Sequence, residues 1–69
     1  MENKFLIDLA VKYGLLDWQI VKITNCAHFV GANGDFDKFK RIAEYICENK
    51  IVDEPEDVIA EELRRNAIV

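Results

Sequence analysis

The chain has 69 residues and a formal net charge of −4, and 51% of its residues are hydrophobic. This length allows one domain, and the negative charge disfavours a nucleic acid or an anionic membrane as the main partner, because both would repel it. No apolar run approaches the ~20 residues of a membrane span, and the N-terminus lacks the pattern of a signal peptide. Two cysteines are too few for a disulfide framework, so we expect a cytoplasmic protein with reduced thiols.

The negative charge is confined to the second half of the chain. Residues 1–34 contain three acids and three bases, whereas residues 35–69 contain ten acids and six bases. The first half is therefore neutral and the second half carries the whole charge of −4. Such an acidic half is suited to a partner with a basic surface.

Residues 1–31 have the periodicity of two helices. The first helix is expected over residues 3–13, followed by Gly14, which can adopt the left-handed conformation that ends a helix. The second helix is expected over residues 17–30, with Asp17 as its N-cap.

Residues 35–69 predict a second pair of helices, which follows a glycine-containing turn at residues 31–34. The third helix is expected over residues 35–48, with Asp35 as its N-cap, and has the cleanest amphipathic pattern in the chain. The fourth is expected over residues 54–66. Its start is indicated by Asp53, Pro55 and Glu56, of which Asp53 and Glu56 have the spacing of a capping box.

The two halves repeat one order of signals at an interval of 36 residues: an apolar helix, a tight turn, two apolar residues, an aspartate and another helix. The aligned positions include Leu15 with Ile51, Leu16 with Val52, Asp17 with Asp53, and Ile23 with Ile59. Identity is nearly absent beyond the aspartates, so the pattern indicates shared packing rules and does not show a duplication. We therefore predict an all-α fold, a small four-helix bundle made of two antiparallel αα-hairpins (residues 1–31 and 35–69) in a single domain, 1–69.

Metal, cofactor and catalytic sites are not expected. Residues 33–37 resemble the middle of a calcium-binding EF-hand loop, but the remaining ligand positions would fall on Phe29, Gly31 and Lys40, which cannot serve. Cys26 and His28 lie two residues apart on a helix and do not face each other. The sequence contains no phosphate-binding glycine loop and no nucleophile motif, so we expect no catalytic residue, no cofactor and no metal.

A cluster of acids dominates the surface expected for the fourth helix. It comprises six acids within ten residues: Asp53, Glu54, Glu56, Asp57, Glu61 and Glu62. Such a run commonly provides solubility and compensates the helix dipole. It can also form a face for a basic protein partner, and we name these six residues as the candidate partner-binding residues.

Three aromatic residues are candidate anchors of an interface: Tyr13, Trp18 and Tyr45. Aromatic side chains concentrate at interface hot spots, although in a small domain they also complete the core. The first two helices have wide apolar stripes, which predict self-association, most simply as a homodimer.

The function predicted is that of a small acidic, non-catalytic protein–protein interaction module: an adaptor, a regulator or an inhibitor. Its size and acidity would suit a protein of a phage or a mobile element. The alternative is a helix-turn-helix-like DNA-binding regulator, in which Lys38, Lys40 and Arg41 at the start of the third helix would contact the DNA. Acids on the same helix face and the overall charge weaken this alternative.

Overall fold

The computed structural model describes residues 2–69, with the side chains of residues 4–69. This part of the chain folds into four helices and contains no strand. The helices are α1 (Glu2–Tyr13), α2 (Asp17–Phe29), α3 (Phe36–Glu48) and α4 (Glu56–Arg65). The all-α, four-helix fold predicted from the sequence is confirmed.

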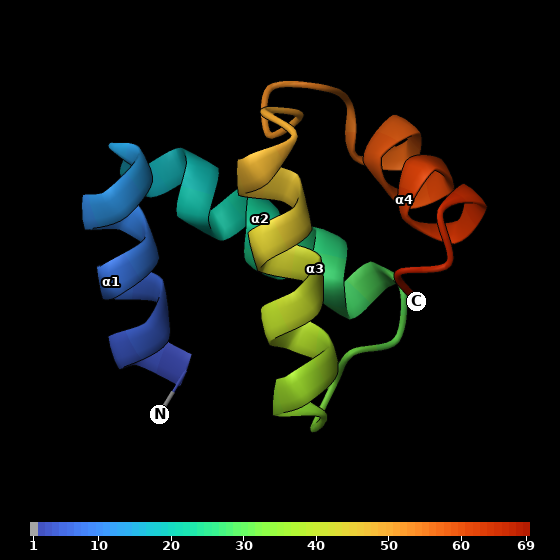
Figure 1. The fold of residues 1–69 in the computed structure, drawn as a ribbon, viewed down its shortest axis with the longest axis horizontal. Helices are drawn as coiled ribbons and strands as arrows, with labels where there is room; N and C mark the ends of the chain where they lie inside the picture. The colour runs from blue at the N-terminus through green and yellow to red at the C-terminus, as the bar shows by residue number, and fades with distance from the viewer. Residues whose placement is uncertain (1) are drawn as a thin grey trace.

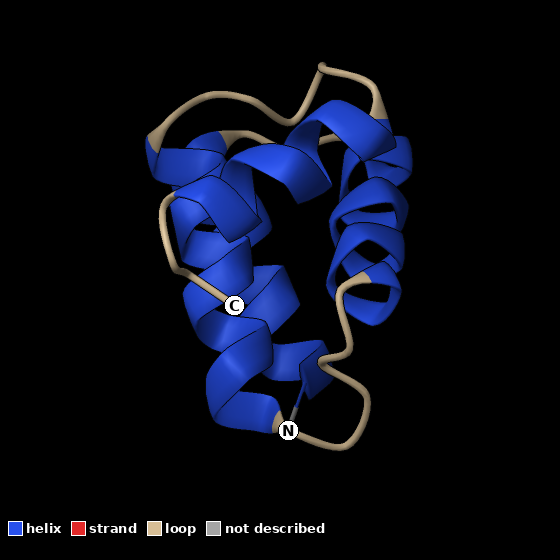
Figure 2. Ribbon diagram, turned by 90° about the vertical axis from the view of Figure 1, so that its right-hand side faces the viewer, coloured by secondary structure: helices blue, strands red, loops and turns tan. Residues whose placement is uncertain are grey.

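Helix α3 occupies the centre of the bundle. It packs against both α1 and α2, and α2 packs in turn against α4. In Figure 1, α1 lies at one edge of the molecule and α4 at the other, while α2 crosses behind α3. The same helices are seen from the side in Figure 2, with the connecting loops at the periphery. Pairing of α1 with α2 and of α3 with α4 as two antiparallel hairpins is not confirmed, since neither pair is among the main packing contacts.

The core follows from this arrangement. Helix α3 buries an entire face, which consists of Phe39, Ile42, Ala43, Ile46 and Cys47. Helices α2 and α4 each bury three residues, whereas the described part of α1 buries Leu9 alone. Helix α3, which has the most strongly amphipathic sequence, is thus the helix with neighbours on two sides. Helix α1 lies at an edge and buries little.

All four described helices end in the same motif. A residue just beyond each helix has a positive φ: 65° at Gly14, 88° at Gly31, 55° at Lys50 and 56° at Ala67. The next N–H then donates to a carbonyl five residues earlier: Leu15 to Ala10, Ala32 to Ala27, Ile51 to Ile46 and Ile68 to Leu63, at 2.9–3.2 Å. This is the Schellman motif, and each of its last residues is apolar.

Helix α3 begins as predicted, because the Asp35 carboxylate accepts the Lys38 N–H at 3.1 Å. The predicted N-cap at Asp17 is wrong. Leu16 occupies that position in an extended conformation, and its N–H donates to the Gln19 side-chain oxygen at 2.8 Å. Asp17 lies instead in the first turn, where its charge still favours the helix dipole.

The predicted start of the fourth helix is also wrong. Helix α4 begins at Glu56, Pro55 occupies the N-cap position, and no side chain caps it. A residue that precedes proline is disfavoured in the helical conformation, so Glu54 cannot extend the helix backwards. The capping box of Asp53 and Glu56 therefore does not form, and Asp53 instead accepts the Gln19 side-chain N–H at 3.2 Å.

Candidate interaction surface

Large apolar side chains are exposed mainly on the first two helices and at their junction. Those more than half exposed are Ile7, Val11, Leu16, Trp18, Val21 and Phe29, all within the first half of the chain. In the second half, Val58 and Val69 are exposed to smaller fractions. Scattered exposed hydrophobic residues are normal, but their concentration on neighbouring elements is typical of an interaction surface.

The exposed side of α2 forms an apolar face with two aromatic residues. We define the α2 face as Trp18, Val21 and Phe29. Trp18 and Phe29 are eleven residues apart, which is three helical turns, so they project from the same side of α2. Trp18 is 52% exposed and Phe29 is 61% exposed.

Cations lie over both rings of the α2 face. Lys22 Nζ is 5.8 Å from the centroid of the Trp18 ring, and the Arg64 guanidinium of α4 is 5.7 Å from that of Phe29. These contacts are within the range of cation–π attraction, which is weak at exposed sites. Each ring thus has one cation beside it and remains more than half exposed.

The three predicted aromatic anchors differ in their environments. Tyr13 and Tyr45 are half-buried and pack against the core, so they contribute mainly to the fold. Trp18 is exposed. Val21 and Phe29 were not singled out in the sequence, although the spacing of Trp18 and Val21 on one side of α2 was a signal for this face.

A second apolar feature is the α1 strip, which we define as Ile7 and Val11. The two side chains are four residues apart, on the side of α1 away from its buried residue Leu9. Val11 is 80% exposed and Ile7 is 62% exposed. Since α1 packs mainly against α3, this strip has no helix over it in the described chain.

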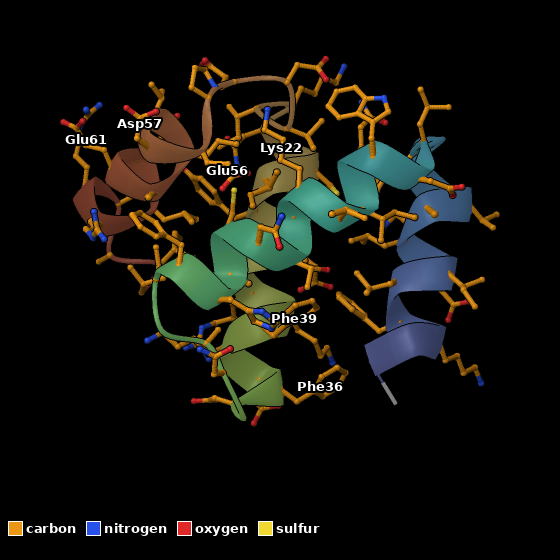
Figure 3. All side chains as sticks on the ribbon, turned by 180° about the vertical axis from the view of Figure 1, so that it is seen from behind. Lys22, Phe36, Phe39, Glu56, Asp57 and Glu61 are labelled. Atoms are coloured by element: carbon orange, nitrogen blue, oxygen red, sulfur yellow. The ribbon has the colours of Figure 1, made fainter. Side chains whose placement is uncertain are left out.

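The six candidate acids do not share one direction. Asp57 and Glu61 point away from the bundle, whereas Glu56 lies toward α2 and Lys22 (Figure 3). Glu61 pairs with Arg65 at 3.4 Å, and Asp53 bonds to Gln19. The two others, Glu54 and Glu62, are half-buried. The open acidic surface therefore centres on Asp57 and Glu61 and is partly neutralised by an arginine.

The candidate DNA contacts lie on the central helix. Lys38 and Lys40 are half-buried and Arg41 is exposed. Lys40 Nζ lies over the rings of Phe5 and Phe36, 6.0 and 5.7 Å from their centroids. Part of this basic segment is thus engaged with α1, and a recognition helix would need its base-reading side free.

Two of the cavities among the described residues are shallow. One, of about 290 Å³, lies beside the edge-to-face pair of Phe5 and Phe36 and is also lined by Lys4, Asp8 and Lys40. The other, of about 230 Å³, lies at the ends of α1 and α3, near Gln19 and Asp53. Both are below the size typical of ligand pockets, roughly 300–1,000 Å³.

Burial governs the chemistry of the two free cysteines. Burial, with a contribution from the nearby Glu56 carboxylate, raises the pKa of Cys26 to about 11. Burial likewise raises the pKa of Cys47 to about 11, assisted by Glu48 and Glu44. At neutral pH both thiols are protonated, and a protonated thiol is a poor nucleophile.

Metal-binding clusters and membrane-spanning helices are both absent from the part of the chain that the structure describes. No group of three or more His, Cys, Asp or Glu side chains there is arranged to hold a metal ion. None of the described helices has the length and apolar character needed to cross a membrane. Comparisons with family models, curated proteins and solved structures give no match to this chain.

Proposed function

We propose that this protein is a non-catalytic interaction module that binds another protein through the α2 face. The observation that carries the proposal is the exposure of Trp18 and Phe29 on one side of α2, with Val21 beside them. Exposed aromatic groups lose contact with water when a partner covers them, and tryptophan is among the residues most enriched at hot spots. The protein would act as an adaptor, a regulator or an inhibitor.

Charge defines the chemistry of the partner. The open acids Asp57 and Glu61 point outward from α4 (Figure 3), the helix whose Arg64 lies over Phe29 of the α2 face. A partner with an apolar pocket for Trp18 and a basic rim would meet both surfaces, and complementary charge would raise the association rate. We place this interaction in the cytoplasm and propose that the protein self-associates through its remaining apolar surface.

The test compares capture of partners from host lysate by the wild type and by Trp18→Ala. Trp18 is outside the buried core, so this variant should fold normally while losing one specific partner or more. Glu44→Ala, an exposed change on α3, is the matched control and should retain them. Equal capture by Trp18→Ala and the control would show that the α2 face is not the binding surface.

A DNA-shift assay at low salt distinguishes the alternative function. The wild type should leave duplex DNA unshifted if the protein acts on another protein. A shift that falls steeply with salt and is lost in Arg41→Ala would favour the DNA-binding regulator and contradict our proposal.

A further inference from the structure

We propose that the α1 strip is a homodimer interface, in which α1 packs antiparallel against α1 of a second copy. The inference rests on the self-association included in the proposed function and assigns it to one helix and one register. It does not involve the α2 face, which remains available to a different protein.

The internal repeat identifies the α1 strip as an uncovered packing surface. Ile7 and Val11 correspond, 36 residues later, to Ala43 and Cys47 of α3. In α3 these two positions are only 0% and 5% exposed, because α3 lies between α1 and α2. The same side of α1 lies at the edge of the molecule and carries larger apolar side chains.

Charge on α1 suits a second copy of the same helix. Lys4, Asp8 and Lys12 recur every four residues along one flank of the α1 strip, and all three are exposed. Among the residues that the structure describes, ion pairing is limited to Glu61 and Arg65, so neither Asp8 nor Lys12 has an ion-pair partner there. Lys12 Nζ lies 5.3 Å from the centroid of the Tyr13 ring, a contact that is weak at an exposed site and that an ion pair with a second copy would replace.

The geometry of an antiparallel pair brings these charges together. A twofold axis that lies between two helices, perpendicular to them, keeps the same flank of each helix on the same side. With the axis level with Ala10, Asp8 lies about 3 Å to one side along the helix and Lys12 about 3 Å to the other, from the rise of about 1.5 Å per residue. Asp8 of each copy is then level with Lys12 of the other, and the Val11 side chains meet near the centre.

The net charge of the molecule permits this contact. Residues 1–34 are neutral, and α4, which carries four acids, lies at the opposite edge (Figure 1). Two copies joined through α1 therefore hold their acidic surfaces apart. One helix face buries less than a standard interface of about 800 Å² per partner, so the dimer should be weak and reversible.

The test is sedimentation equilibrium of the full chain at concentrations up to the low millimolar range. The wild type should dimerise reversibly, and Val11→Lys should be monomeric throughout. Asp8→Lys and Lys12→Asp should each weaken the dimer about tenfold, because two attractive pairs become repulsive. A mixture of Asp8→Lys and Lys12→Asp should form a heterodimer, since every pair across the interface is then of opposite charge.

Asp57→Lys at the opposite edge is the matched control and should dimerise as the wild type does. Circular dichroism should show unchanged helix content in every variant, because all these positions are exposed. A wild-type dimer that Val11→Lys leaves intact, or single charge variants without heterodimer formation, would overturn this interface but leave self-association in place. A strictly monomeric wild type would overturn both, and neither result bears on the partner captured through Trp18.

Discussion

The first and second halves of the molecule share a scaffold and differ in surface. Their helices end in the same motif 36 residues apart, at Gly14 and Lys50 and again at Gly31 and Ala67. Some buried positions also correspond, such as Ile23 with Ile59, whereas the exposed Val11 corresponds to the buried Cys47. Other exposed apolar residues of the first half correspond to charged residues in the second. The clearest pairs are Trp18 with Glu54, Val21 with Asp57, and Phe29 with Arg65.

This comparison separates what packing requires from what is free to vary. Positions that are buried in both halves, such as Ile23 and Ile59, carry apolar residues, and the positions that end the helices have left-handed backbone in both halves. Exposed positions carry no such restriction. The first half uses them for apolar contact area and the second half uses them for charge, so the two halves are suited to different contacts.

The largest expected effect tests whether the two halves contribute equally to the one buried core. Ile23 and Ile59 occupy corresponding positions, and both are 0% exposed. Ile23→Ala and Ile59→Ala should each lower the free energy of unfolding by about 2–5 kcal/mol, through lost burial and a cavity. The milder Ile→Val changes, at about 1 kcal/mol, keep the comparison measurable by chemical denaturation if the alanine variants do not fold.

If the losses in free energy of unfolding caused by Ile23→Val and Ile59→Val differ by more than about 1 kcal/mol, the two positions do not contribute equally to the core. Trp18→Ala serves as the exposed control. Since it leaves no cavity in the core, its effect on stability should remain within about 0.5 kcal/mol.

The two buried cysteines, one in each half, predict that the free energy of unfolding depends on pH. Their pKa is raised from 9.0 to about 11 in the folded protein, so the unfolded chain loses these protons first. The thiols should therefore have little effect on stability well below pH 9, and stability should fall between pH 9 and 11 by about 2 kcal/mol for each thiol. Chemical denaturation across this range measures the loss.

Other groups also titrate in this pH range, so the control is the pair of variants Cys26→Ala and Cys47→Ala. Each should flatten the pH dependence, because it removes one thiol whose ionisation the fold opposes. A wild-type profile that these variants do not change would show that the thiols are not responsible.

A smaller effect on stability is expected at the helix ends, where the same left-handed backbone is adopted by glycine in the first half and by other residues in the second. Lys50 and Ala67 adopt left-handed backbone without being glycine, at φ of 55° and 56°. Lys50→Gly and Ala67→Gly should each raise the free energy of unfolding by about 1 kcal/mol, since a side chain at positive φ is strained. Thermal and chemical denaturation both measure the gain.

The converse changes in the first half complete this test. No atom lies within 4 Å of a Cβ placed on Gly14, so Gly14→Ala is affected by backbone strain alone. It should lower stability by about the amount that Lys50→Gly raises it. A neutral Gly14→Ala variant would contradict the comparison of these two helix ends.

The sequence predicted those parts of the fold that depend on local signals. The amphipathic pattern of α3, its Asp35 cap and the left-handed Gly14 all follow from neighbours within a turn or two. Lys50 and Ala67 were not predicted as helix-ending residues, because they have no glycine signal. In both cases the next residue, Ile51 or Ile68, packs against the core and helps to set the backbone.

Less of the candidate interaction surface could be predicted from the sequence. A helix with two apolar strips, such as α1, does not specify which strip its neighbours will cover, because that depends on how distant helices cross. Ile7 and Val11 therefore could be placed on a wide stripe but not identified as exposed. The acids of the second half were recognised as a cluster, but the turn before Pro55 determines which of them face outward.

The smallest expected effect concerns the contact that joins the two halves directly. Gln19 accepts the Leu16 N–H and donates to Asp53, so one side chain connects the start of α2 with the loop before α4. Gln19→Ala should lower the free energy of unfolding by about 1 kcal/mol, mostly through the lost cap. Asp53→Ala should cost less, because it removes only an exposed hydrogen bond of 3.2 Å.

The double variant isolates the link between the halves. In a double-mutant cycle, Gln19→Ala and Asp53→Ala should show a coupling energy of no more than about 0.5 kcal/mol, typical of exposed polar pairs. A larger coupling would mean that this contact contributes substantially to holding the halves together. A coupling near zero would leave their association to the buried helix contacts of α3 with α1 and α2 and of α2 with α4.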